Sequence, residues 1–134
     1  MKFMEETVQK MCDVQRHGGP DDEGLWKDES AGLVLGHRRL SLLDLSSAGH
    51  QPMIWKGRYV VSFNGEVYNF ESIRNELQHF GHRFRTQSDT EVILAAFEQW
   101  GTLSFAKFEG MFAFALWDQQ EQQLFLVRDP SGIK

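Results

Sequence analysis

The sequence predicts a single α+β domain in which antiparallel sheet is covered by helices. Two observations support this: strands are expected both before and after a pair of amphipathic helices, and a short turn joins the last two strands into a hairpin. With 134 residues, the chain can bury roughly two thirds of its unfolded surface in one core. No internal repeat, low-complexity tract or interdomain linker divides it.

The first third of the chain alternates between apolar segments and loops. Residues 5–15 carry apolar side chains at helical spacing among charged ones, which predicts a short amphipathic helix. Residues 17–24 are rich in Gly, Pro and Asp and predict a loop. Residues 32–37 then predict an apolar strand, and residues 46–52 predict another loop.

A buried strand is expected next, because residues 59–63 are mostly β-branched or aromatic. The pair Asn64-Gly65 after it favours a turn. Asn69 stands where it can cap a helix whose apolar residues share one face, and Gly81 is placed to end that helix.

The last third predicts a helix followed by a hairpin. Residues 88–91 match a capping box, so a second helix is expected from Asp89 to about Gly101. Large and small apolar residues alternate over 111–117, which is typical of a strand covered on both faces. A turn and a strand over 124–128 complete the hairpin.

Composition argues against several function classes. The 14 basic and 19 acidic side chains give a formal charge of -5, so no electrostatic footprint for nucleic acid or an anionic membrane is present. No apolar run approaches the ~20 residues of a membrane span, and the first 15 residues lack the apolar core of a signal peptide. One cysteine cannot form an internal disulfide, which favours a cytoplasmic location. The five histidines are scattered without zinc-like spacing, so no metal site is expected.

Polar groups at the ends of apolar segments form a candidate amino-acid site. A free α-amino acid needs a guanidinium for its carboxylate and carboxylates for its ammonium group, and Arg39, Glu66 and Asp89 supply that set. The Asn64 side chain and the Gly65 N–H could donate to a carbonyl oxygen on which negative charge develops. The alternative is that Asn64-Gly65 is a structural turn, Asp89 a helix cap and Arg39 a surface charge. The residue types alone leave both interpretations open.

Six ordered motifs occur with compact spacing, at residues 16–24, 36–41, 63–69, 88–92, 110–118 and 128–134. Together they resemble the glutaminase domain of glutamine-hydrolysing asparagine synthetases, which are class II glutamine amidotransferases. The resemblance runs from about residue 7 to the last residue, and the sequence of residues 42–52 favours asparagine synthetases over other branches of the class.

The resemblance implies an N-terminal-nucleophile fold, a four-layer αββα sandwich of antiparallel sheets, from which the first strand is missing here. It implies that Arg39 binds the glutamine α-carboxylate and that Glu66 and Asp89 hold its α-ammonium group. Asn64 and Gly65 would form the oxyanion hole. The backbone of three leucines would line the pocket: Leu40, Leu42 and Leu43.

The catalytic nucleophile of the class is a cysteine that becomes the first residue and begins a strand well before the motif at Arg16. Cys12 stands only four positions before Arg16, inside the expected helix, and does not match that cysteine. Residues 1–134 are therefore expected to be a partial glutaminase domain, truncated at both ends, that hydrolyses glutamine poorly by itself.

The resemblance also implies partners. In the intact family, glutamine is hydrolysed to glutamate, and the ammonia passes to a synthetase domain that uses ATP and Mg to amidate aspartate to asparagine. The expected partners are L-glutamine and such a synthetase domain, with no cofactor within these residues; a homodimer stays open. The alternatives are a non-catalytic glutamine-binding or interaction module and a truncation product without function.

Overall fold

The computed structural model describes residues 22–39 and 51–130. Nothing is described of residues 1–21, 40–50 and 131–134, where the helix expected over 5–15 falls. The elements are, in chain order, β1 (Asp22–Asp28), β2 (Leu33–Arg39), β3 (Met53–Trp55), β4 (Tyr59–Val67), α2 (Phe70–His79), α3 (Asp89–Trp100), the 3₁₀ helix η3 (Gly101–Lys107), β5 (Gly110–Asp118) and β6 (Gln123–Arg128).

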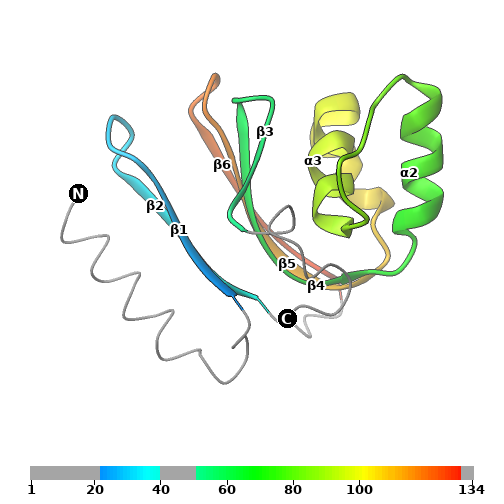
Figure 1. The fold of residues 1–134 in the computed structure, drawn as a ribbon, viewed down its shortest axis with the longest axis horizontal. Helices are drawn as coiled ribbons and strands as arrows, with labels where there is room; N and C mark the ends of the chain where they lie inside the picture. The colour runs from blue at the N-terminus through cyan, green and yellow to red at the C-terminus, as the bar shows by residue number, and fades with distance from the viewer. Residues whose placement is uncertain (1–21, 40–50, 131–134) are drawn as a thin grey trace.

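The described elements form three stacked layers (Figure 1). β1 and β2 pair as an antiparallel hairpin, and β3-β4-β5-β6 form an antiparallel sheet in that order. α2 and α3 cover one face of the four-stranded sheet, and the β1–β2 hairpin covers the other. The predicted α+β architecture of antiparallel sheet covered by helices is confirmed.

The main core lies between the four-stranded sheet and the two helices. Alternate residues of β4 and β5 point to this side, as the period of a strand requires. α3 is buried on all sides from its first residue to Phe97, whereas α2 buries only Ile73 and Leu77. The side chains that fill the sheet side of this core include Phe63, Phe112, Phe114 and Leu116.

A smaller core joins the two sheets. Leu35 of β2 packs with Val60 of β4 and Trp117 of β5, and all three are buried. Two hydrogen bonds accompany this contact, because the Ser62 hydroxyl donates to the Gly36 carbonyl at 3.0 Å and Trp117 Nε1 donates to Asp28 Oδ2 at 3.2 Å. The alternating run in β5 is therefore covered on both faces, as its pattern predicts.

The ends of α2 match the sequence prediction, but Asn69 acts differently from a cap. Asn69 occupies the N-cap position and makes no side-chain capping bond. Its side chain instead donates to the Lys107 carbonyl at 2.8 Å and accepts from the Glu109 N–H at 3.0 Å, which holds the chain between η3 and β5. Gly81, at φ 94°, follows the last turn of α2 as predicted.

Three strand assignments differ from the sequence prediction. β1 begins at Asp22, inside the expected loop 17–24, because those residues pair with β2. β3 was not predicted, since three residues carry too little periodicity to be recognised. β4 continues to Val67 rather than ending near Asn64, because β5 pairs with it over its whole length. In β4, pairing with the distant strand β5 overrides the turn preference of Asn64-Gly65, whereas β1 and β3 each pair with the next strand in the chain.

Gly110 generates a prediction about stability. At φ 154°, a Cβ added to it would lie 2.1 Å from the Glu66 carbonyl oxygen of the neighbouring strand. We expect Gly110→Ala to lower the free energy of unfolding by more than about 3 kcal/mol, since the clash is with backbone and cannot be relieved by a rotamer change. Urea denaturation followed by tryptophan fluorescence measures this loss.

Gly57→Ala is the matched control, because Gly57 also has positive φ but no atom lies within 4 Å of an added Cβ. It should cost only about 1 kcal/mol, from backbone strain alone. Equal losses for the two variants would contradict the steric argument.

Candidate functional site

β4 extends beyond its neighbour β3, and within residues 22–39 and 51–130 no other strand pairs with that part of its edge. β3 pairs only with Tyr59–Val61, whereas β5 pairs with β4 from Tyr59 to Val67. Backbone groups on the β3 side beyond Val61 need other partners if they are buried. This free edge of β4 runs through the segment that the sequence singled out, Asn64-Gly65-Glu66.

Two buried side chains supply those partners. The Phe63 N–H donates to Gln51 Oε1 at 2.6 Å, and the Val67 N–H donates to Asp89 Oδ2 at 3.0 Å. N–H groups of alternate residues in a strand point to the same side. The Gly65 N–H therefore faces the same edge, midway between the two anchored groups.

Gly65 is required by the close approach of β5. It has φ 119°, and an added Cβ would lie 2.0 Å from the Met111 carbonyl oxygen and 2.8 Å from the Phe112 Cα. The strand passes through Asn64-Gly65 without reversing, because both residues keep their register with β5. The interpretation of Asn64-Gly65 as a turn is wrong.

Asn64 and Glu66 are exposed and lie on the opposite face of β4 from the helices. They alternate in step with Ser62, whose hydroxyl donates to the Gly36 carbonyl of β2, so they face the layer of the β1–β2 hairpin. Their side chains are thus accessible beside the free edge of β4.

Arg39 is the last residue of β2, where it stands opposite Asp22. Its side chain lies outside the described part of the structure, so its predicted role is neither supported nor contradicted by geometry. Three further predicted residues lie outside the described residues altogether: Leu40, Leu42 and Leu43.

Asp89 is the first residue of α3 and lies buried against β4, with 5% of its surface exposed. Burial raises its pKa to about 6, and the charge of Glu66 adds to this, while the Val67 N–H opposes it. Ser88 is the N-cap and accepts a hydrogen bond from the Thr90 N–H at 3.0 Å, so the predicted start of the helix is confirmed. The structure brings Asp89 next to the Asn64-Gly65-Glu66 segment.

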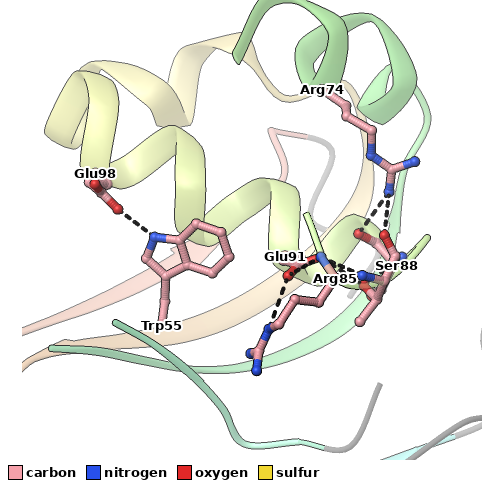
Figure 2. Close-up of polar contacts among 7 residues, drawn as sticks. Trp55, Arg74, Arg85, Ser88, Glu91 and Glu98 are labelled. Atoms are coloured by element: carbon pink, nitrogen blue, oxygen red, sulfur yellow. Dashed lines mark hydrogen bonds and ion pairs between the residues drawn. The ribbon is translucent and has the colours of Figure 1, made fainter. Parts of the chain in front are cut away.

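Glu91 extends this polar framework into the loop before α3 (Figure 2). Its fully buried carboxylate accepts from the Arg85 N–H at 3.0 Å, and from the N–H and hydroxyl of Thr86 at 2.9 Å and 3.0 Å. The Ser88 N–H donates to Thr86 Oγ1 at 3.0 Å rather than to Glu91. The capping box thus correctly predicts the helix start but not the partner of Glu91, which reaches back to the loop.

Arg74 of α2 also forms hydrogen bonds to the loop before α3 (Figure 2). It donates to Gln87 Oε1 at 3.1 Å and, at longer range, to the carbonyls of Thr86 (3.4 Å) and Ser88 (3.5 Å). Its guanidinium also lies 5.5 Å from the centre of the Phe84 ring. The loop that leads to Asp89 is therefore held by side chains of both helices, α2 and α3.

Gln51 is the residue of this site that sequence reasoning missed. It falls in a segment expected to be a loop, and a glutamine before a proline carries no periodic signal. Only the spatial proximity of residues 39 positions apart, Gln51 and Thr90, shows its place.

Within residues 22–39 and 51–130, no group of three or more His, Cys, Asp or Glu side chains is arranged to hold a metal ion. No helix among those residues is long and apolar enough to cross a membrane.

The sequence profile of the glutamine amidotransferase domain family matches residues 1–134. The chain belongs to this family. It is 44% identical over 138 residues to a Mycobacterium tuberculosis H37Rv protein provisionally named asparagine synthetase (glutamine-hydrolysing), which covers 96% of the chain and 21% of that protein. It is 41% identical over 131 residues to asparagine synthetase (glutamine-hydrolysing) 1 of Bacillus subtilis, covering 97% of the chain and 20% of that protein.

This glutamine amidotransferase domain thus spans about a fifth of the length of the curated relatives it matches. A solved structure, the glutamine phosphoribosylpyrophosphate amidotransferase of B. subtilis complexed with ADP and GMP, superposes with a TM-score of 0.63. The two are 23% identical, over 75% of this chain and 24% of that one. The likeness shows the fold, and the predicted N-terminal-nucleophile architecture is confirmed.

The raised pKa of Asp89 predicts a specific pH dependence of stability. Because the carboxyl binds its proton more tightly when folded, its ionisation lowers the free energy of unfolding as pH rises from about 4 to about 6. Asp89→Asn keeps an oxygen for the Val67 N–H and removes the charge. We expect the free energy of unfolding of the variant minus that of the wild type to rise by about 2 to 3 kcal/mol between pH 4 and pH 7.

Urea denaturation at half-unit pH steps measures this difference, and other titrating groups cancel in it. A difference that stays flat from pH 4 to pH 7 would show that Asp89 has an ordinary pKa.

Proposed function

We propose that this domain binds L-glutamine and, together with the cysteine nucleophile of its family, releases the amide nitrogen as ammonia, as the glutaminase part of a cytoplasmic asparagine synthetase. The single observation that carries the proposal is the hydrogen bond between Asp89 and the Val67 N–H, because it places a buried carboxylate beside the exposed Asn64-Gly65-Glu66 segment. The relatives named asparagine synthetase support the choice of product, and the ammonia would pass to a synthetase domain that uses ATP and Mg to amidate aspartate.

The α-ammonium group of glutamine would bind between Asp89 and Glu66. The buried carboxylate of Asp89 is costly to ionise without a cation, and its pKa of about 6 expresses that cost. An ammonium group beside it would favour the ionised form, and Glu66 would supply a second negative charge. Arg39 would bind the α-carboxylate, with the backbone of the following leucines, Leu40, Leu42 and Leu43, along the side of the ligand.

The carboxamide would lie along the free edge of β4. There the Gly65 N–H, which faces that edge, and the Asn64 side chain would donate to the carbonyl oxygen. In hydrolysis the thiolate of the family's cysteine nucleophile would add to the carboxamide carbon, and negative charge would develop on this oxygen. The amide nitrogen would then take up the proton that the thiol gave up and leave as ammonia, and water would cleave the thioester to give glutamate and restore the thiol. Donors held at a fixed edge stabilise that charge without reorganising.

A second candidate, glutamine binding without hydrolysis, is favoured by one observation. The 134 residues contain a single cysteine, Cys12, which stands four positions before Arg16 and does not match the family's nucleophile. Residues 1–134 on their own would keep the glutamine site and lack the attacking group.

Glutamine binding tests the site itself. We expect isothermal titration calorimetry at pH 7.5 to show saturable binding of L-glutamine, weakened at least about tenfold by Asp89→Asn because a charge-assisted hydrogen bond is lost. Affinity should also fall as pH drops below about 6, where Asp89 becomes protonated.

Glu121→Gln is the control, because it removes an exposed carboxylate from the β5–β6 turn. Absence of binding by the wild-type chain would refute the proposed site, and unchanged affinity in Asp89→Asn would remove Asp89 from it.

Hydrolysis tests the second candidate. We expect the 134-residue chain to release glutamate on the order of 10⁶-fold more slowly than a member of the family with its nucleophile, as for other hydrolases deprived of theirs. Cys12→Ser should leave this residual rate unchanged in a coupled glutamate assay. Turnover at ordinary enzymatic rates that disappears in Cys12→Ser would make Cys12 the nucleophile.

A further inference from the structure

We propose that Gln51 is a positioning residue of the glutamine site: it fixes the Asn64-Gly65 donors relative to Asp89. This inference rests on the proposed function, because it concerns the same site. In the proposed pose Gln51 contacts neither the carboxamide carbon of glutamine nor the sulfur that attacks it. It acts by holding β4 and α3 in place relative to each other.

The side chain of Gln51 forms hydrogen bonds to both elements that carry the site, β4 and α3. Its Oε1 accepts from the Phe63 N–H at 2.6 Å, and its Nε2 donates to Thr90 Oγ1 at 3.2 Å. Phe63 directly precedes Asn64, and Thr90 directly follows Asp89. A single carboxamide therefore bridges the strand that carries the oxyanion donors and the helix turn that carries the ammonium-binding carboxylate.

This bridge complements the bond between Asp89 and Val67. One link lies two residues before Gly65 and the other two residues after it, so along an extended strand they are ~13 Å apart. A single link would let the first turn of α3 pivot relative to the edge of β4. Two links on either side of Gly65 fix both the spacing and the angle, which matters because stabilisation of a developing oxyanion is lost with small displacements of the donors.

Glutamine suits this position because one planar group both donates and accepts. Gln51 is only 5% exposed and Thr90 only 2%, so each polar atom needs a partner within the protein. An apolar residue would leave the Phe63 N–H unpaired on the free edge, and a carboxylate would place a second buried negative charge close to the first turn of α3.

The test compares three variants by calorimetry with L-glutamine. Gln51→Leu removes both bonds, and Thr90→Val removes the link to the helix while preserving the shape of the side chain. Gln119→Leu is the matched control, because Gln119 makes a comparable bond, from Nε2 to the Gly57 carbonyl at 3.2 Å, at the far end of β4. We expect a loss of affinity of about tenfold for Gln51→Leu, a smaller loss of about threefold for Thr90→Val, and none for Gln119→Leu.

A second measurement needs no ligand and separates positioning from simple stabilisation. In ¹⁵N–¹H spectra of the folded chain, we expect Thr90→Val to shift the amide resonances of Phe63 and Gly65, because the change passes through Gln51. In the Gln51→Leu background, Thr90→Val should leave those two resonances unmoved. A role confined to satisfying the edge of β4 would give no such dependence on Thr90.

The outcomes separate the inference from the proposed function. If the wild-type chain binds no glutamine, the proposed function fails, and the amide shifts alone decide whether Gln51 couples β4 to α3. If glutamine binds but Thr90→Val moves neither amide, or if folded Gln51→Leu binds as tightly as the wild type, the positioning role is refuted. Should Gln51→Leu fail to fold, Thr90→Val carries both measurements.

Discussion

The free edge of β4 is the constraint on which the rest of the site depends. β3 covers only the first three residues of β4, and the buried N–H groups beyond it must find acceptors elsewhere. Gln51 and Asp89 provide them at Phe63 and Val67. The packing of α3 against the sheet therefore follows from hydrogen bonding as well as from its apolar surface. The first turn of α3 is brought to the edge of β4 that the Gly65 N–H also faces.

This arrangement has an electrostatic cost that a ligand can relieve. Burial raises the pKa of Asp89 to about 6, and Glu66 adds repulsion, so near neutral pH the fold holds a carboxylate that would be better solvated in the unfolded chain. An ammonium group entering the site would compensate for the lost solvation. The same feature thus lowers stability without ligand and favours the cationic end of an amino acid, as is common where binding sites are built from strained or desolvated groups.

The sequence predicts the parts of the fold that local interactions determine. α2, α3 and the β5–β6 hairpin carry their own apolar periodicity and end signals, such as Gly81 and Ser88. β1 and β3 pair with the next strand in the chain but carry too little apolar alternation to be recognised. The continuation of β4 through Asn64-Gly65 depends on pairing with the distant strand β5, which local turn preference does not reveal. Asp89 and the Asn64-Gly65-Glu66 segment could be named because carboxylates and amides at element ends are visible in sequence. The link from Gln51 to Thr90 could not, since it joins two elements through one side chain.

Asp129 shows why bonding alone does not define a binding site. It is buried, and its Oδ2 accepts from the Phe112 N–H at 3.0 Å, much as Asp89 accepts from Val67. Both carboxylates satisfy backbone donors of the same sheet, which is a structural role. Asp89 differs in its surroundings. Within three residues of its partner Val67 lie the exposed carboxylate of Glu66, the exposed amide of Asn64 and the Gly65 N–H on the free edge of β4. The case for function at Asp89 therefore rests on what its hydrogen bond places beside it, and the bond itself explains only how the first turn of α3 is held against β4.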